Sequence, residues 1–548
     1  MKKIIILLVF IVSMIGMAKE VNIKILGTSD VHGHIVPWNY PADEFDDSGS
    51  YSQIAKMVKG YRKANKNIIL VDAGDIIQDN LIERFINEPK HPAMSVLNEM
   101  NYDVLVPGNH EFNFGMESIT NVLKQFKGKA LAANIYYNDG RSYLEPSTII
   151  TKDGVKIGII GVTTPLTQKF EENTGNVKNM TFTMPIPEVK KQVELLKSKG
   201  VNAIIVVAHM GLPNENNLPG TGVIDLAKEV PGIDVIIAGH FHKDVSKETV
   251  NGVIITEPYK YGMSLSVVDL KFDVNGKSVS LVSKDSKTIS VKGEESDQGI
   301  EIIYNPFHQT LRNEVNEVIG ETSNNMVPEG KLKGISYAFA KDTGLSSLIN
   351  EVELYYSKAD VVSFSFDHEN IRMNKGAIKR KDIFYNYRYA GGEVTVYEMT
   401  GKDLKDYMEW SAGYFGTLKP GDTEYSYDAD RRSFKYVTYD IFGGVKYKID
   451  LQQGPGNRIK DLTLVSGNRR ITDKTKLKVG MNSYRFEMLI QKGGPLEGRN
   501  IKKIWDSKEV LGQEKGTIQN MTINYIMNVK KGKINGLSKN YWSIIGLK

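Results

Sequence analysis

Five short apolar runs in the first half of the chain each lead into a residue of a type that binds metal ions. Runs of this kind, bounded by glycine or proline, are typical of buried strands. In open α/β sheets, ligands gather beyond the carboxyl ends of the strands. We therefore expect the residues after these runs to meet at one edge of an α/β domain. The segments are Ile23–Leu26 before Asp30-Val-His32, Ile68–Val71 before Asp72-Ala-Gly-Asp75, Val104–Val106 before Gly108-Asn-His-Glu111, Ala203–Ala208 before His209, and Val235–Ala238 before Gly239-His-Phe-His242.

The chain of 548 residues is too long for a single core, and its pattern changes after residue 290. Strands alternate with helical segments up to about residue 270, which predicts a layered α/β domain. We expect a signal segment at 1–18, this first domain at 19–290, a linker at 291–320 and a second α/β domain at 321–548. Expected elements are helices Ser50–Asn65, Ala93–Met100, Met116–Phe126, Pro187–Lys199, Tyr337–Tyr356 and Lys402–Ala412, a hairpin Ser266–Ser290, and strands Val155–Val162, Val361–Phe366, Tyr436–Leu451 and Lys476–Arg485.

Composition limits the location and the partners. The formal charge of +5 is too weak and too dispersed to favour a nucleic-acid polymer or a membrane surface as partner. The absence of cysteine excludes disulfides and thiolate metal ligands. Lys2-Lys3, the apolar run Ile4–Ile15 and the small residues of Gly16-Met17-Ala18 are typical of a secretory signal. We expect an exported protein, periplasmic or extracellular, without a stable membrane anchor; the oligomeric state stays open.

The polar segments suit a pair of divalent ions. Two ions about 3.5–4 Å apart can clamp a phosphoryl group and activate water. They need a bridging carboxylate with nitrogen and oxygen ligands, and Asp75, directly after a strand and a glycine, suits the bridge. Asp30 and His32 are expected to share a face as alternate residues of an extended segment, as are His240 and His242. The adjacent His110 would then face the substrate. The expected metal ligands are Asp30, His32, Asp75, Asn109, His209, His240 and His242.

Single motifs within this set are weak signals. Asp-x-His is common in surface loops. His209 alone could be a histidine at the end of a strand, with its ring nitrogens hydrogen-bonded within the protein. Gly108-Asn-His-Glu111 is much more specific, and five of the nine histidines fall in these motifs. Glu111 could support an imidazole or begin a helix. Imidazole and carboxylate ligands suit zinc, manganese, cobalt or iron, so the metal is not identified.

These motifs resemble those of calcineurin-like metallophosphoesterases joined to a 5'-nucleotidase-type C-terminal domain. The resemblance implies an N-terminal β-sandwich flanked by helices. It also implies that Asp30, His32, Asp75 and His242 bind one metal, that Asp75, Asn109, His209 and His240 bind the other, and that His110 is catalytic. In the C-terminal domain it implies that two aromatic rings clamp the nucleobase, here Tyr439 and Tyr484. In a domain so rich in tyrosine, both could instead belong to strand cores.

Within that family, the chain looks most like the bacterial 2',3'-cyclic-nucleotide 2'-phosphodiesterase/3'-nucleotidases. His91-Pro92 and Asn113 are typical of this branch, whereas 5'-nucleotidases usually have an aspartate at the position of Asn113. Ser363-Phe-Ser-Phe366 replaces their glycine-rich segment with its arginine, and Tyr414 occupies the position of a further arginine. The segments Tyr439–Asp450, Gly456–Ile459 and Asn482–Arg485 also fit this branch.

We therefore expect an exported enzyme with two divalent metal ions. It would open 2',3'-cyclic nucleotides to 3'-nucleotides and dephosphorylate these to nucleosides. One alternative is a 5'-nucleotidase or nucleotide-sugar hydrolase. An alternative of another class is a surface binding protein that keeps the same fold.

Overall fold

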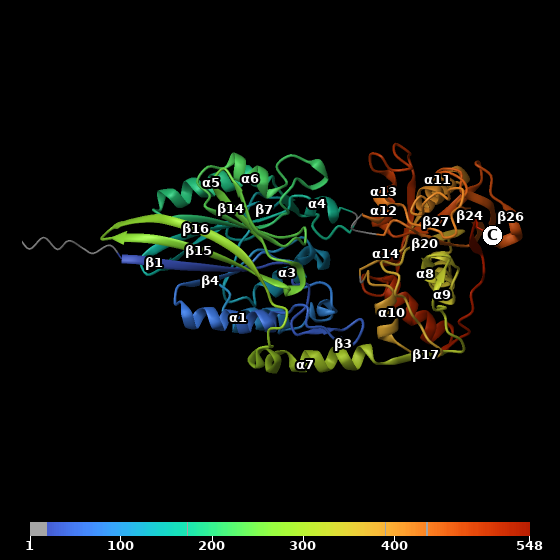
Figure 1. Ribbon diagram of the computed structural model, residues 1–548, viewed down its shortest axis with the longest axis horizontal. Coiled ribbons are helices and arrows are strands. Elements are labelled where there is room, and N and C mark those ends of the chain that lie inside the picture. The colour runs from blue at the N-terminus through green and yellow to red at the C-terminus, as the bar shows by residue number, and fades with distance from the viewer. Residues whose placement is uncertain (1–18, 173, 390, 434–436, 548) are drawn as a thin grey trace, which may run out of the picture. The chain divides into compact units, whose positions relative to one another are not determined.

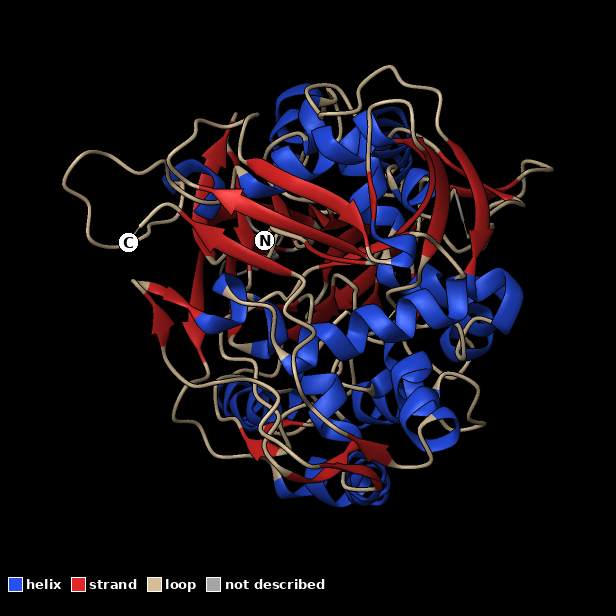
Figure 2. Cartoon of the chain, turned by 90° about the vertical axis from the view of Figure 1, so that its right-hand side faces the viewer, coloured by secondary structure: helices blue, strands red, loops and turns tan. Residues whose placement is uncertain are grey.

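The computed structural model describes residues 19–172, 174–389, 391–433 and 437–547 (Figure 1). The expected signal segment 1–18 lies outside the described residues. The chain forms two compact units that divide within helix α7 (Gln298–Val315), at Thr310–Leu311, while Tyr40–Asp43 belongs to the second unit. Both units combine helices and strands. Figure 2 shows the helices in blue and the strands in red. Among the described residues, no helix is both long enough and apolar enough to cross a bilayer.

The first unit contains two six-stranded sheets whose neighbouring central strands run parallel. In one sheet β1 (Lys19–Thr28), β4 (Ile68–Asp72) and β5 (Val104–Leu105) are parallel neighbours. In the other, β11 (Ala203–His209) lies parallel to β12 (Val235–Ala238). The sheet orders are β16-β15-β1-β4-β5-β6 and β13-β14-β12-β11-β9-β8. The remaining strands are β6 (Lys129–Ala130), β8 (Ser147–Lys152), β9 (Val155–Thr163), β13 (Val245–Val250), β14 (Val253–Glu257), β15 (Ser264–Asn275) and β16 (Ser278–Ser290).

The main core of this unit lies between the two sheets. Buried residues of both sheets form one cluster, which includes Ile23, Ile69 and Val104 on one side and Ile157 and Ile205 on the other. A second cluster packs helices α5 (Pro185–Ser198) and α6 (Val223–Glu229) on the outer face of the β11 sheet. Figure 1 shows these two helices on one side of the unit and α1 (Tyr51–Ala64) on the other. The expected β-sandwich flanked by helices is therefore confirmed.

Most of the expected elements of this unit are present with small shifts. Helices α1, α2 (Pro92–Glu99), α3 (Gly115–Leu123) and α5 lie where the apolar spacing predicted them. The closing hairpin consists of β15 and β16, which pair antiparallel. The five strands that were expected to deliver polar residues are β1, β4, β5, β11 and β12, and parallel pairing brings their carboxyl ends to the same edge of each sheet.

The second unit has a five-stranded sheet, β23-β20-β27-β22-β28, and a four-stranded sheet, β26-β25-β24-β30. A three-stranded sheet, β21-β17-β29, adds to these. Its helices include α9 (Gly344–Ser357), α11 (Gly401–Ala412) and α13 (Ser483–Ile490). The strands are β17 (Val318–Thr322), β20 (Val361–Phe364), β21 (Gly376–Lys379), β22 (Thr395–Thr400), β23 (Ile441–Gly443), β24 (Val445–Asp450), β25 (Ile459–Leu464), β26 (Arg469–Arg470), β27 (Lys476–Met481), β28 (Lys502–Asp506), β29 (Lys533–Ile534) and β30 (Trp542–Ile545).

Three expectations for the second unit were wrong. The helix expected at 337–356 is split into α8 (Tyr337–Ala340) and α9, because Thr343 begins a new helix through a capping box with Ser346. The strand expected at 436–451 breaks at Gly444, whose φ of +81° and close approach to the Asp360 carbonyl exclude a side chain. The strand expected at 476–485 ends at Met481, where Asn482 caps helix α13.

Candidate metal centre

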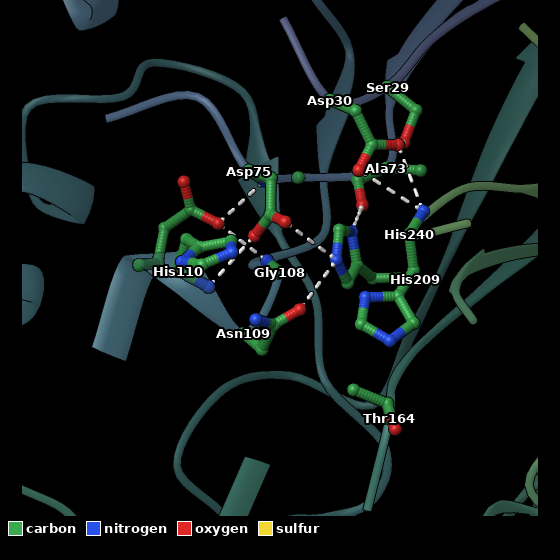
Figure 3. Close-up of polar contacts among 12 residues, drawn as sticks. Ser29, Asp30, Ala73, Asp75, Gly108, Asn109, His110, Thr164, His209 and His240 are labelled. Atoms are coloured by element: carbon green, nitrogen blue, oxygen red, sulfur yellow. Dashed lines mark hydrogen bonds and ion pairs between the residues drawn. The ribbon is translucent and has the colours of Figure 1, made fainter. Parts of the chain in front are cut away.

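The structure brings the seven predicted ligand side chains together at the carboxyl ends of their strands. Figure 3 shows five of them: Asp30, Asp75, Asn109, His209 and His240. Potential ligand atoms of Asp30, His32 and His242 lie within 4.8 Å of one another, and the same holds for Asp75, His209 and His240. Asn109 joins the second group, because its Oδ1 lies 3.0 Å from Nε2 of His209. Three of these residues are completely buried or nearly so: Asp30, Asp75 and His209.

The second group places hydrogen-bond acceptors against one another. Nδ1 of His209 lies 2.7 Å from the Ala73 carbonyl, so this nitrogen carries the proton. In a neutral ring Nε2 is then an acceptor, yet it faces Oδ2 of Asp75 at 3.1 Å and Oδ1 of Asn109 at 3.0 Å. Such an arrangement is stable only with a cation among the three atoms, either a proton or a metal ion. Burial lowers the pKa of His209, but the charge and hydrogen bond of Asp75 outweigh it and raise the pKa to about 10.

The first group directs an electron pair of His32 toward His242. Nδ1 of His32 lies 3.2 Å from the Gln78 carbonyl, which leaves Nε2 as an acceptor 3.2 Å from Nε2 of His242. Nε2 of His242 is in turn 3.3 Å from Oδ1 of Asp30. Burial lowers the pKa of His32 to about 4, despite the opposing charge of Asp75. The His32 ring is therefore neutral at neutral pH and has a free electron pair for a cation.

Asp75 lies between the two groups. Its Oδ2 is 3.1 Å from Nε2 of His209 and 3.8 Å from Nε2 of His32. Its Oδ1 accepts a hydrogen bond of 2.8 Å from the backbone N–H of His110, which fixes the orientation of the carboxylate. One carboxylate facing both groups is what a bridging ligand requires, and the oxygen, imidazole and amide donors fit a pair of divalent cations.

Five of the seven ligand residues have left-handed backbone conformations, which the sequence did not indicate. Asp30 and His32 have φ of +54° and +48°, and His240 and His242 have φ of +74° and +53°. We expected the two members of each pair to share a face of an extended segment. Instead, sharp local bends turn their side chains inward. Asp75 is also left-handed, with φ of +58°. Each such residue costs on the order of 1–2 kcal/mol, so the surrounding contacts must hold it in place.

Glu111 supplies many of those contacts. Its carboxylate accepts hydrogen bonds from the backbone N–H groups of Asp75 (2.8 Å), Ile76 (2.6 Å), Ile77 (3.2 Å) and Gly108 (2.6 Å). It thus ties the loop after β4 to the loop after β5. Burial and the nearby charge of Asp75 raise the pKa of Glu111. The sequence showed a carboxylate beside Asn109 and His110 but did not show that its partners are loop amides.

Glu215 is a further residue that the sequence analysis missed. Its Oε1 lies 3.0 Å from Nε2 of His240, and its Oε2 accepts a hydrogen bond of 3.1 Å from Thr164. Because Nε2 of His240 is engaged in this way, Nδ1 is the nitrogen left for a metal. Carboxylates often orient metal-binding histidines from behind. Glu215 begins a short 3₁₀ helix (Glu215–Asn217) between β11 and α6 and belongs to no motif, so no sequence signal pointed to it.

His110 lies beside the two groups without belonging to either. Its ring centroid is 5.5 Å from that of His32, and its Nδ1 is 2.7 Å from Oδ1 of Asn113. Among the other histidines, His34 stacks on Tyr261 with a centroid separation of 4.4 Å. His91 precedes Pro92 at the start of α2, where burial lowers its pKa to about 3.

The two tyrosines expected to clamp a nucleobase have different environments. Tyr484 lies in the first turn of α13 and is 57% exposed. Tyr439 is only 1% exposed and is enclosed by aromatic rings. It therefore offers no open ring face in this structure, contrary to expectation. The rings around it are those of Phe339, Tyr414, Phe415 and Trp542.

Each of the two units contains a segment that matches a known protein family. Residues 23–244 match the calcineurin-like phosphoesterase family, and residues 318–489 match the 5'-nucleotidase C-terminal domain. A trifunctional nucleotide phosphoesterase of Bacillus subtilis is 26% identical over 79% of this chain, but the match spans only 33% of that protein. A 2',3'-cyclic-nucleotide 2'-phosphodiesterase/3'-nucleotidase of Haemophilus influenzae is 26% identical over 85% of this chain and 80% of its own length.

A solved structure shows the same fold along nearly the whole chain. It is a putative 5'-nucleotidase from Staphylococcus aureus in complex with α-ketoglutarate, with a TM-score of 0.76 and 20% identity. The likeness covers 96% of this chain and 100% of the other. Residues 23–244 therefore form a domain of the calcineurin-like phosphoesterase family and residues 318–489 a 5'-nucleotidase-type C-terminal domain, and the chain is a metal-dependent phosphoric ester hydrolase.

Proposed function

We propose that the protein opens 2',3'-cyclic nucleotides to 3'-nucleotides and dephosphorylates these to nucleosides. The main support for this chemistry is that seven side chains with oxygen or nitrogen donor atoms converge on two neighbouring candidate metal positions. The proposed ligands are Asp30, His32 and His242 on one side and Asn109, His209 and His240 on the other, with Asp75 shared. The proposed substrate rests on the similarity to the Haemophilus enzyme, which extends over most of both chains.

The side chains of the site have different roles in the proposed reaction. Two divalent ions held by the seven residues would supply Lewis-acid activation of the phosphate ester and of the attacking water. Glu111 and Glu215 hold the ligand loops and the His240 ring in place. His110 lies next to this centre without being needed as a ligand. We assign it the transfer of a proton from Nε2 to the ribose oxygen as the bond between that oxygen and phosphorus breaks.

The second unit favours this substrate class over 5'-nucleotides. The positions at which 5'-nucleotidases are expected to carry arginines hold Ser363, Phe364 and Phe366 in one segment and Tyr414 in another. All four are buried and uncharged. None of these four side chains carries a charge of its own that could bind a 5'-phosphate. Tyr484, whose ring is exposed, remains the candidate for stacking on the base.

We further propose that the protein is exported, because residues 1–18 have the composition of a secretory signal. The mature protein would then begin after Ala18. Sequencing the N-terminus of the protein recovered outside the cytoplasm tests this, and a mature chain that retains Met1 would contradict it.

The substrate is tested by the release of inorganic phosphate or nucleoside from adenosine 2',3'-cyclic, 3'- and 5'-phosphates. We expect kcat/KM for the 3'-ester to exceed that for the 5'-ester, and the cyclic ester to yield the 3'-monophosphate as an intermediate. Preference for the 5'-ester would assign the protein to the 5'-nucleotidases instead. Failure to hydrolyse any of the three with metal supplied would favour a binding protein on the same fold.

Replacement of His110 tests the proton transfer. We expect His110→Ala to lower kcat on the 3'-ester by about 10²–10⁴-fold, the usual contribution of general acid–base catalysis. The metal content should not change, because His110 lies outside both ligand groups. His34→Ala is a matched control, since that ring is also buried near the site but stacks on Tyr261. Undiminished turnover in the His110 variant with its metals bound would contradict the assignment.

Metal binding should become tighter as the pH rises. The pKa of His209 is raised to about 10 by Asp75, so below that pH a cation must displace a proton from Nε2. His32, with its pKa lowered to about 4, adds no such competition above neutral pH. We expect the association constant for Mn²⁺ to rise about tenfold per pH unit between pH 6 and 9, as loss of one proton requires. An affinity independent of pH, measured by chelator competition, would contradict this assignment.

A further inference from the structure

A carboxylate stands behind the amide that holds His110. Oδ1 of Asn113 lies 2.7 Å from Nδ1 of His110, and Nδ2 of Asn113 donates a hydrogen bond to Oε1 of Glu171. Glu171 directly follows helix α4 (Thr167–Phe170) and is 58 residues away from Asn113 along the chain. The position where 5'-nucleotidases are expected to have an aspartate is thus an amide here, but a carboxylate is present one side chain further on.

This order of groups fixes the proton on His110. An ionised carboxylate can only accept hydrogen bonds, so the amide nitrogen of Asn113 must face Glu171. The amide oxygen must then face His110, and Nδ1 of the ring must be the donor. Nε2, on the opposite edge of the ring, is left for the reacting group. Without Glu171 the amide could turn around, and Nδ1 could then be held as an acceptor.

Glu171 is itself held firmly. Its side chain is buried, with 3% of the residue exposed. Its Oε2 accepts hydrogen bonds from Oγ1 of Thr174 at 2.6 Å and from Nδ2 of Asn176 at 2.8 Å. Asn176 also donates to the backbone carbonyl of Asn113 at 2.8 Å, so one side chain ties both partners together. The carboxylate is therefore fixed before any substrate binds.

We propose that Glu171 is a positioning residue for the reaction, acting through Asn113 on His110. The inference rests on the proposed function, in which His110 gives a proton to the leaving ribose oxygen. For this step the His110 ring carries a proton on both nitrogens. As the oxygen of water bonds to phosphorus and the phosphorus–ribose oxygen bond breaks, the proton on Nε2 passes to the ribose oxygen, and a proton that the water loses replaces it on Nε2. Nδ1 keeps its proton, held by Asn113. The negative charge of Glu171 polarises the amide and strengthens this hydrogen bond.

Glu171→Gln removes the charge with little change of shape, and its single acceptor oxygen can serve either Asn113 or the pair Thr174 and Asn176, but not both. The assays use the nucleotide that the wild-type enzyme hydrolyses fastest and, in parallel, 4-nitrophenyl phosphate. The second ester has a leaving group that departs without a proton. We expect kcat on the nucleotide to fall roughly 10- to 100-fold, the range seen for outer partners of metal-bound histidines, with KM changing about twofold at most. The rate on 4-nitrophenyl phosphate should change by less than about threefold.

Exchanging the two groups provides the rescue. In the double variant Asn113→Asp, Glu171→Gln the carboxylate accepts directly from His110, and the glutamine amide donates to it, so every donor and acceptor is matched again. We expect the double variant to regain a nucleotide rate within about threefold of wild type. Asn113→Asp alone places two carboxylates in contact, which is unfavourable, and should be slower than the double variant. Glu172→Gln, at an exposed neighbouring position, is the matched control and should behave as wild type.

The outcomes separate this inference from the function on which it rests. A wild-type enzyme with no activity on any phosphate ester overturns the proposed function. An active wild-type enzyme whose Glu171→Gln variant is unchanged, or is slowed equally on both esters, overturns the role of Glu171 alone. Absence of rescue in the double variant also overturns it. If Glu171→Gln does not fold, Asn113→Ala breaks the same chain from the other side. It must then slow the nucleotide and spare 4-nitrophenyl phosphate.

Discussion

The site depends on an electrostatic arrangement that the protein cannot satisfy with its own neutral groups. Nε2 of His209 faces two oxygen acceptors, Asp75 and Asn109, while its Nδ1 is committed to the Ala73 carbonyl. Around His32, the electron pair of Nε2 points to Nε2 of His242, and a proton on His242 can satisfy it. Electron pairs that converge in a buried place repel one another unless a positive charge lies among them. In the metal-free protein a proton on His209 provides that charge, which is why its pKa is raised. A divalent ion would provide it better.

The rest of the first unit keeps this arrangement in place. Parallel neighbours β1, β4 and β5 in one sheet, and β11 and β12 in the other, deliver the ligands to matching edges. Five of the seven ligands then take left-handed backbone conformations, each at a cost of on the order of 1–2 kcal/mol. Glu111 offsets part of this cost by accepting four backbone N–H groups from two loops. These hydrogen bonds keep the two loops from relaxing to other conformations, so the ligand side chains stay directed toward the site.

Much of this could be predicted from the sequence, and the failures have physical causes. Apolar periodicity located the strands of the first unit, because buried β-branched runs are a local signal. The same signal failed at Asn482, where a capping side chain ended an expected strand early and began helix α13, and at Gly444, where close packing broke another strand. Ligand identity was readable, but the backbone conformation of Asp30 and His32 was not. Glu171 and Glu215 could not be found, since each meets its histidine or amide partner only through the tertiary fold. Burial of Tyr439 likewise depends on packing that no local pattern reports.

We propose that seven side chains hold two divalent cations, with Asp75 between them. The most direct test is a crystal of the protein grown with Mn²⁺, with diffraction collected at the manganese absorption edge. We expect two anomalous peaks about 3.5–4 Å apart, one among Asp30, His32 and His242 and the other among Asn109, His209 and His240, with Asp75 in contact with both. Peaks elsewhere on the protein, or a single peak without contact to Asp75, would contradict it.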